Sequence, residues 1–219
     1  MNELQAKIWA PYINLVGAEN FKIHKIFVKS KHYSGFDLSQ QVNAEEYAAG
    51  QVQQIIARYA EYKDIINKSA LNVSDISLIF DGLVAKDFID SELVYLINNK
   101  TLEVSNKEWW DLIKSLWTRQ EFNSVGNRKN NWIEIFKYKE RTRALTSGLP
   151  SKFTAYRAGN DDGFSWTLDE RVAQWFHNRF KSEFGDIPFL EREFSKADVV
   201  FYTNSRQEKE VVIVPRKFQ

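Results

Sequence analysis

The sequence contains no cysteine, which excludes disulfides, thiolate metal ligands and a cysteine nucleophile. Its three histidines, His24, His32 and His177, lie too far apart in the sequence to suggest a zinc site. No excess of one charge is present, since 30 Lys and Arg residues face 29 Asp and Glu residues. This balance argues against a protein that coats nucleic acid and against an acidic tail, so a charged partner must bind a local patch.

Long hydrophobic runs are also missing. No run approaches the ~20 apolar residues of a membrane-spanning helix. Glu3, Gln5 and Lys7 interrupt the apolar residues of the N-terminus, unlike the core of a signal peptide. We therefore expect no membrane partner, and the absence of cysteine suits a cytoplasmic location. With 219 residues, 43% of them hydrophobic, the chain is long enough to fill a core.

Helical patterns dominate the first two thirds of the chain. Asn43 precedes a predicted helix to about Lys68, with an apolar stripe of Tyr47, Val52, Ile55, Ile56, Tyr59, Ile65 and Ile66. Ser105 and Glu108 form a capping box before a second helix, whose apolar residues at helical spacing are Trp109, Leu112, Ile113, Leu116 and Trp117. A third helix is predicted from Asn131 to about Ala144, with Trp132 facing inward. We expect the three tryptophans to belong to the core and not to a ligand site.

After Pro150 the pattern changes to short extended segments. Phe153–Tyr156 and Phe164–Trp166 are prone to form strands, and a strong turn signal separates them at Gly159–Gly163. Thr167 and Glu170 predict a second capping box, which opens a helix to about Phe180. Further strands are predicted at Phe189–Phe194, Val199–Thr203 and Val211–Val214.

These patterns predict an α+β protein in which a mainly helical region, 1–149, packs on a small β-sheet core with one crossing helix, 150–219. The break near Pro150 marks a change of structure type, and it is compatible with one continuous domain.

Three short motifs in the last third carry the side chains that suggest chemistry. They are Tyr156-Arg157-Ala158-Gly159, Ser165-Trp166-Thr167 and Glu208-Lys209-Glu210. Alternate residues of an extended strand share one side, so we expect the hydroxyls of Ser165 and Thr167 to share a face, and the carboxylates of Glu208 and Glu210 to do so too. Taken singly, each motif is also explained by a salt bridge, a helix cap or an exposed pair of charges.

In this order the motifs resemble the R-S-E signature of ADP-ribosyltransferases of the toxin-like clade, over residues 150–215. The resemblance implies that NAD+ is split between ribose and nicotinamide without a metal, and that ADP-ribose passes to a macromolecular acceptor. In that family a Glu-x-Glu favours a protein arginine as the acceptor, although some members modify nucleic acid. Compact relatives with preceding helices occur in phages and bacterial toxin systems.

The resemblance also implies a role for each matching residue. Glu210 corresponds to the glutamate that hydrogen-bonds the ribose at the scissile bond, where a carboxylate stabilises the growing positive charge. Glu208 corresponds to the residue that deprotonates or orients the acceptor. Ser165 would bind the nicotinamide ribose and steady Glu210. Arg157 suits a pyrophosphate, because its guanidinium can bind two phosphate oxygens at once.

Other positions match less specifically. Gly159 allows a ligand to approach the backbone, and Thr167 completes the hydroxyl pair, although its predicted cap explains it equally well. Phe184 matches an aromatic residue that stacks on nicotinamide, with core packing as the alternative. The segment Thr203–Gln207, which contains Arg206, occupies the place of the family's acceptor-recognition loop.

Two rival functions remain open: an NAD+ glycohydrolase, in which water attacks, and an inactive binding module of the same fold. A basic cluster before the motifs suggests either a nucleic-acid surface, together with Trp132 and Tyr138, or an ordinary solvated helix. Its members are Arg128, Lys129, Lys137, Lys139, Arg141 and Arg143.

Overall fold

The computed structural model describes residues 3–24, 27–30, 53, 56, 57, 60, 62–82, 84, 89–120, 128–215 and 218. The chain divides into two compact units, Met1–Val104 and Ser105–Gln219, each of which has its own architecture. Most of the helix predicted from Asn43 to Lys68 lies outside the described residues, but residues 62–66 are helical. Among the described residues, no helix is long and apolar enough to cross a membrane.

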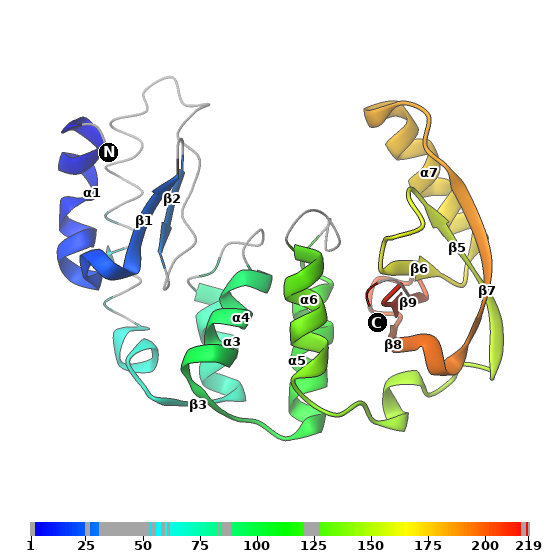
Figure 1. Cartoon of the computed structure of the whole chain (residues 1–219), viewed down its shortest axis with the longest axis horizontal. Coiled ribbons are helices and arrows are strands. Elements are labelled where there is room, and N and C mark those ends of the chain that lie inside the picture. The colour runs from blue at the N-terminus through cyan, green and yellow to red at the C-terminus, as the bar shows by residue number, and fades with distance from the viewer. Residues whose placement is uncertain are drawn as a thin grey trace. The chain divides into compact units, whose positions relative to one another are not determined.

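The first unit combines helices with two small sheets (Figure 1). Besides the helical residues 62–66, its described helices include α1 (Glu3–Val16), α3 (Val73–Gly82) and α4 (Ile89–Asn99), with a short 3-10 turn at Ala18–Asn20. Strands β1 (Phe21–His24) and β2 (Phe27–Ser30) pair antiparallel, whereas β3 (Ala70–Asn72) and β4 (Thr101–Glu103) pair parallel. The helical patterns did not predict these strands, because three or four residues are too few for an alternating pattern to stand out.

The described residues of the second unit form three α-helices and a five-stranded sheet, so the predicted α+β class is confirmed. Its elements are α5 (Asn106–Trp117), α6 (Arg128–Lys137), β5 (Lys152–Ala158), β6 (Ser165–Thr167), α7 (Glu170–Phe184), β7 (Phe189–Ser195), β8 (Val199–Thr203) and β9 (Glu210–Ile213), with 3-10 turns at Arg143–Thr146 and Lys196–Asp198. The predicted strand Val199–Thr203 is confirmed at both ends. Helices α5 and α6, which precede Pro150, belong to the same compact unit as the sheet.

Helices α5 and α6 supply an aromatic core for one side of this unit. The predicted capping box of Ser105 and Glu108 is confirmed, and it fixes the start of α5. Trp109, Trp117 and Trp132 are fully buried, as predicted. Trp117 packs edge-on against Trp132 and against Phe201 of β8. Helix α6 ends at Lys137 and not near Ala144; the chain leaves the helix before the 3-10 turn at Arg143–Thr146.

The sheet has the strand order β7-β5-β6-β9-β8, and every neighbouring pair is antiparallel. Trp166 in the middle of β6 packs into a hydrophobic cluster with Ala155, Val211 and Ile213. Because side chains alternate along a strand, Ser165 and Thr167 point to the opposite face. The motif residues of β5, β6 and β9 are therefore brought onto three adjacent strands.

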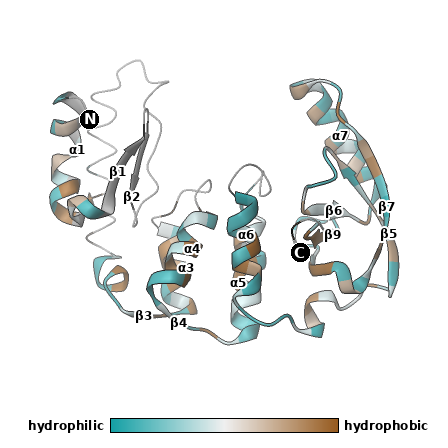
Figure 2. Cartoon of the chain, in the orientation of Figure 1, coloured by the Kyte–Doolittle hydropathy of each residue, from teal (hydrophilic) through white to brown (hydrophobic). Residues whose placement is uncertain are grey.

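Helix α7 is the predicted crossing helix and packs on β5 and β6 (Figure 1). Like α5 and α6, it carries hydrophobic and hydrophilic residues along its whole length (Figure 2). The predicted capping box of Thr167 and Glu170 is wrong. Asp169 is the N-cap and its carboxylate accepts from the Arg171 amide, because Thr167 is still the last residue of β6. The helix also runs four residues beyond Phe180, to Phe184.

Candidate active site

A cavity of about 370 Å³ lies in the second unit, between α7, the sheet and the end of α5. All three motifs contribute to its wall through Arg157, Ser165, Thr167, Glu208 and Glu210. Tyr156, Trp117 and aromatic residues of α7 form the apolar part of the wall. A mainly apolar cavity with a few convergent polar groups is the usual form of a small-molecule site.

Glu210 is the most deeply buried charged group of this wall, with 4% of its surface exposed. Its Oε1 accepts two hydrogen bonds, from Ser165 Oγ at 2.6 Å and from Trp117 Nε1 at 2.9 Å. Its Oε2 is buried and accepts no hydrogen bond from the described residues. One carboxylate oxygen is thus held in place, while the other keeps its capacity to accept.

Burial raises the pKa of Glu210 above its ordinary value. The hydrogen bonds from Ser165 and Trp117 and the charge of Arg206 oppose this shift, and the nearby charge of Glu208 adds to it. A carboxylate so poor in solvent interacts strongly with any positive charge that develops beside it. The geometry therefore suits stabilisation of a cationic transition state.

Ser165 and Thr167 extend along β6 beside Glu210. Thr167 lies directly across from Glu210, and Ser165 reaches it diagonally from the register position of Val212. Both hydroxyls line the cavity, as the alternation of an extended strand predicts. The Thr167 hydroxyl donates to the Glu208 carbonyl and accepts from the Asp169 amide, so it joins the ends of three segments.

Arg157 lies at the predicted strand end, and its guanidinium is held by backbone carbonyls. Nε donates to Asn160 O at 2.8 Å, and Nη1 donates to Ser165 O. Burial lowers the pKa of Arg157, and the charges of Asp162 and Glu210 oppose that shift. Two of its three nitrogens therefore hold the turn between β5 and β6, and a direct role toward a phosphate stays a prediction.

The turn contains two glycines near this guanidinium, and one of them leaves room for it. A Cβ on Gly163 would lie 1.8 Å from Arg157 Nη2, so the guanidinium would have to shift and leave the carbonyls of Asn160 and Ser165. Gly159 has a φ of +104°, which strongly favours glycine, and its nearest neighbour is again Arg157 Nη2, at 3.9 Å from a built Cβ. That distance is an ordinary contact, so backbone conformation and not space requires a glycine here; Gly159 does not line the cavity, and close approach of a ligand to it stays a prediction.

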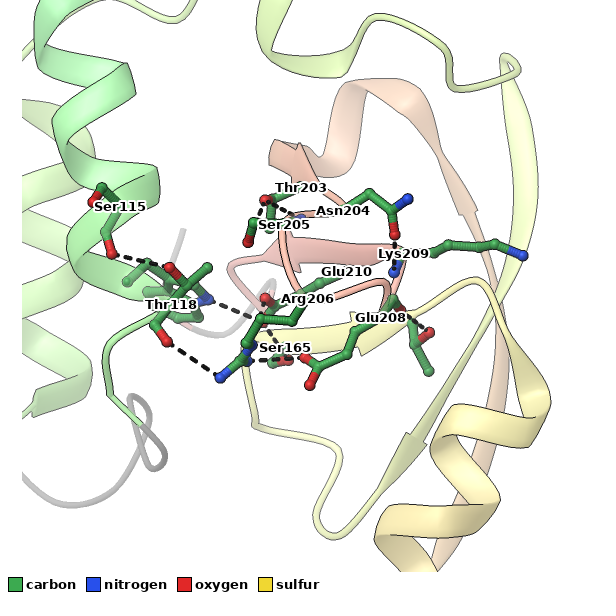
Figure 3. A network of polar contacts seen from close by, with 12 residues as sticks. Ser115, Thr118, Ser165, Thr203, Asn204, Ser205, Arg206, Glu208, Lys209 and Glu210 are labelled. Atoms are coloured by element: carbon green, nitrogen blue, oxygen red, sulfur yellow. Dashed lines mark hydrogen bonds and ion pairs between the residues drawn. The ribbon is translucent and has the colours of Figure 1, made fainter.

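Both carboxylates of the Glu-x-Glu line the cavity, but the backbone that places them there is not the extended strand that was predicted. Strand β9 begins at Glu210, and Lys209 has a φ of 47°, so the motif is not an extended strand opening at Glu208. Arg206 Nη2 lies 2.9 Å from Glu208 Oε2 and 4.0 Å from Glu210 Oε2. Figure 3 shows Lys209 pointing away from both glutamates, and its Nζ lies 3.3 Å from Asp169 Oδ2.

Phe184 does not join the other predicted residues. It is the last residue of α7, 65% exposed, and does not line the cavity. Trp175, Phe176 and Phe180 of the same helix line it instead. Phe184 was expected in a loop over the ligand, but α7 continues through this residue. Its ring therefore packs on the helix against Phe180, with the two ring centroids 6.1 Å apart.

Trp117 is a further site residue that the sequence did not predict. Its helical spacing with Trp109 and Leu112 marked it as core, which is correct for its ring. Its indole nitrogen nevertheless donates to a carboxylate 93 positions away in the chain. The only signal in the sequence was general: the N–H of a buried tryptophan usually finds a hydrogen-bond acceptor.

Two residues of the basic cluster form contacts within the fold. Lys129 forms a 2.7 Å ion pair with Asp162, and Arg141 Nη1 donates to Val199 O at 3.2 Å. Among the described residues, no group of three or more His, Asp or Glu side chains is placed to hold a metal ion.

No protein-family model matches the chain, and searches of curated proteins and of solved structures also gave no match.

Proposed function

We propose that the chain is a mono-ADP-ribosyltransferase that splits NAD+ and transfers ADP-ribose to a macromolecular acceptor, favouring a protein arginine. The observation that carries this proposal is the state of Glu210. Its carboxylate is buried in the wall of the cavity, Ser165 and Trp117 hold one oxygen, and the other accepts no hydrogen bond from the described residues.

The reaction breaks the bond between C1′ of the ribose and the nicotinamide nitrogen, and the electron pair leaves with nicotinamide. Positive charge then grows on the ribose, and the Glu210 carboxylate opposes it electrostatically. The acceptor nitrogen forms the new bond to C1′, and its proton passes to the Glu208 carboxylate. No metal enters this chemistry, because the leaving group departs as a neutral molecule.

The remaining wall fits the parts of a dinucleotide. Tyr156, Trp175, Phe176 and Phe180 provide rings on which a flat base can stack. Arg179 also lines the cavity, with its guanidinium 5.7 Å from the Trp175 ring centroid. Together with Arg157 it supplies positive charge for a pyrophosphate.

An NAD+ glycohydrolase is the second candidate, and the position of Glu208 favours it. The Glu208 carboxylate forms an ion pair with Arg206 at 2.9 Å. While that pair persists, Glu208 is not free to take a proton from an acceptor, whereas attack by water needs no positioned acceptor.

Incubation with NAD+ labelled in the adenylate part and a cell lysate tests the proposal. A transferase leaves a labelled macromolecule, and digestion with protease or nuclease then identifies its class. Glu193→Gln on β7 is a matched control, because that glutamate is exposed and lies outside the cavity. Nicotinamide release without any labelled macromolecule would favour the glycohydrolase, and absence of both would refute the proposed function.

A further inference from the structure

Arg206 lies in the loop between β8 and β9, at the edge of the cavity. Its guanidinium contacts several oxygen atoms there. Nη2 lies 2.9 Å from Glu208 Oε2, and Nη1 donates to the carbonyl of Thr118 at 3.2 Å. Figure 3 shows the side chain reaching from its loop toward both residues. One planar cation thus bridges a carboxylate and a backbone carbonyl.

The carbonyl strengthens this site because of its place in the fold. Thr118 is the C-cap of α5, and the carbonyls at a helix C-terminus carry partial negative charge. Glu210 adds a third oxygen, since its Oε2 lies 4.0 Å from Arg206 Nη2 and accepts no hydrogen bond from the described residues. A buried carboxylate oxygen without a hydrogen-bond donor is suited to accept one from a ligand. The contacts of Arg206 with Glu208 and Thr118 would not by themselves indicate a ligand site.

The geometry points to a guanidinium-binding site formed by Glu208, Glu210 and the Thr118 carbonyl, in which Arg206 is an internal occupant that an acceptor guanidinium displaces. Rotation of Arg206 toward solvent is feasible, because its side chain is 41% exposed and is held at its tip. The vacated oxygens match the planar fork of an arginine better than the compact ammonium of a lysine.

This inference deepens the proposed function by assigning the acceptor a binding site and a competitor. Displacement of Arg206 would also release the Glu208 carboxylate, which the ion pair otherwise engages. A tethered group competes at an effective concentration of about millimolar or more. A free guanidinium compound should therefore bind wild-type protein weakly, and removal of Arg206 should strengthen its binding on the order of tenfold or more.

The test is calorimetric titration of the full chain with agmatine, a small guanidinium compound, without NAD+. Arg206→Ala and Arg206→Gln should both bind agmatine at least about tenfold more tightly than wild type, by the same competition argument. Adding Glu208→Gln to either variant should abolish that gain. Arg192→Ala is the matched control, since Arg192 is an exposed arginine of β7 that pairs with Asp161. Putrescine, which carries ammonium groups, should gain less than agmatine.

Equal agmatine affinity in wild type and both folded Arg206 variants would overturn the inference, as would a gain that survives Glu208→Gln. Thermal unfolding of each variant verifies the fold. The proposed function fails separately, because it is measured as nicotinamide release from NAD+. Agmatine binding without any NAD+ cleavage would retain the guanidinium site and reject the transferase, and cleavage with unchanged agmatine affinity would do the reverse.

Discussion

Trp117→Phe should destabilise the protein in a pH-dependent manner. The substitution keeps an aromatic ring in the core but removes the N–H that donates to Glu210 Oε1 at 2.9 Å. A hydrogen bond to a charged group contributes about 1.5–3 kcal/mol, against about 0.5–1.5 kcal/mol between neutral groups. The loss should therefore be about 1 kcal/mol larger when Glu210 is ionised than when it is protonated.

The direction of the pH effect follows from the raised pKa of Glu210. A carboxyl whose pKa is higher in the folded state favours folding most at low pH, and this contribution is lost as the pH rises through the folded-state pKa. Trp117→Phe removes an interaction that lowers this pKa, so it raises the pKa further and deepens the loss. The free-energy difference from wild type should grow with pH and then level off.

Thermal unfolding of both proteins between acid and neutral pH measures this difference, and about 1 kcal/mol corresponds to roughly 2–8 °C in Tm. Trp109→Phe is the matched control. Trp109 is a fully buried tryptophan of the same helix, and its Nε1 donates to no acceptor among the described residues. Its penalty should reflect ring volume and stay constant with pH. Parallel pH dependence in the two variants would refute the assigned hydrogen bond.

Three further predictions concern the turn, the second glutamate and the pH profile. Gly163→Ala should destabilise the protein by about 1–3 kcal/mol through its clash with Arg157. In an Arg157→Ala background, urea unfolding should show a much smaller loss of stability for the same substitution. Equal losses in the two backgrounds would mean that Arg157 is not the source of the clash. Glu208→Ala should retain nicotinamide release while labelling of the acceptor falls further, and equal loss of both would contradict the separate roles. The rate of nicotinamide release should rise with pH, with a midpoint above the pKa of an ordinary glutamate. Ser165→Ala should move this midpoint to higher pH, because the hydrogen bond from Ser165 lowers the pKa of Glu210. A midpoint that Ser165→Ala does not change would argue against Glu210 as the titrating group.

Local signals in the sequence predicted the elements that carry the motifs. The β-branched run of β8 and the capping box of α5 each depend on residues close together in the sequence, so both were predicted correctly. The three motifs also line one cavity, because antiparallel pairing places β6 between β5 and β9.

The conformation of the Glu-x-Glu could not be predicted, because it depends on contacts within a loop. Asn204 binds the loop back on itself: its Oδ1 accepts from the Lys209 amide at 3.0 Å, and its carbonyl accepts from the Gln207 amide at 3.0 Å. Gln207 and Lys209 consequently take positive φ values, which side-chain alternation does not anticipate.

Long-range contacts set the chemistry of the site, and these leave little local signal. The pairing of Trp117 with Glu210 joins an N-terminal helix of the second unit to its last strand. The engagement of Arg157 by Asn160 and Ser165 likewise depends on how the turn closes. Residue types and spacing predicted which groups gather, but not which atoms remain available.

The charge of Glu210 is the central claim, and nicotinamide release from NAD+ tests it most directly. Glu210→Gln keeps the shape of the side chain and both hydrogen bonds at the position of Oε1, but it removes the charge opposing the developing cation. We predict that wild-type protein releases nicotinamide and that folded Glu210→Gln does so at least about 10²-fold more slowly, while Glu193→Gln matches wild type. Wild-type release by folded Glu210→Gln, or no release by the wild-type protein, would contradict the account.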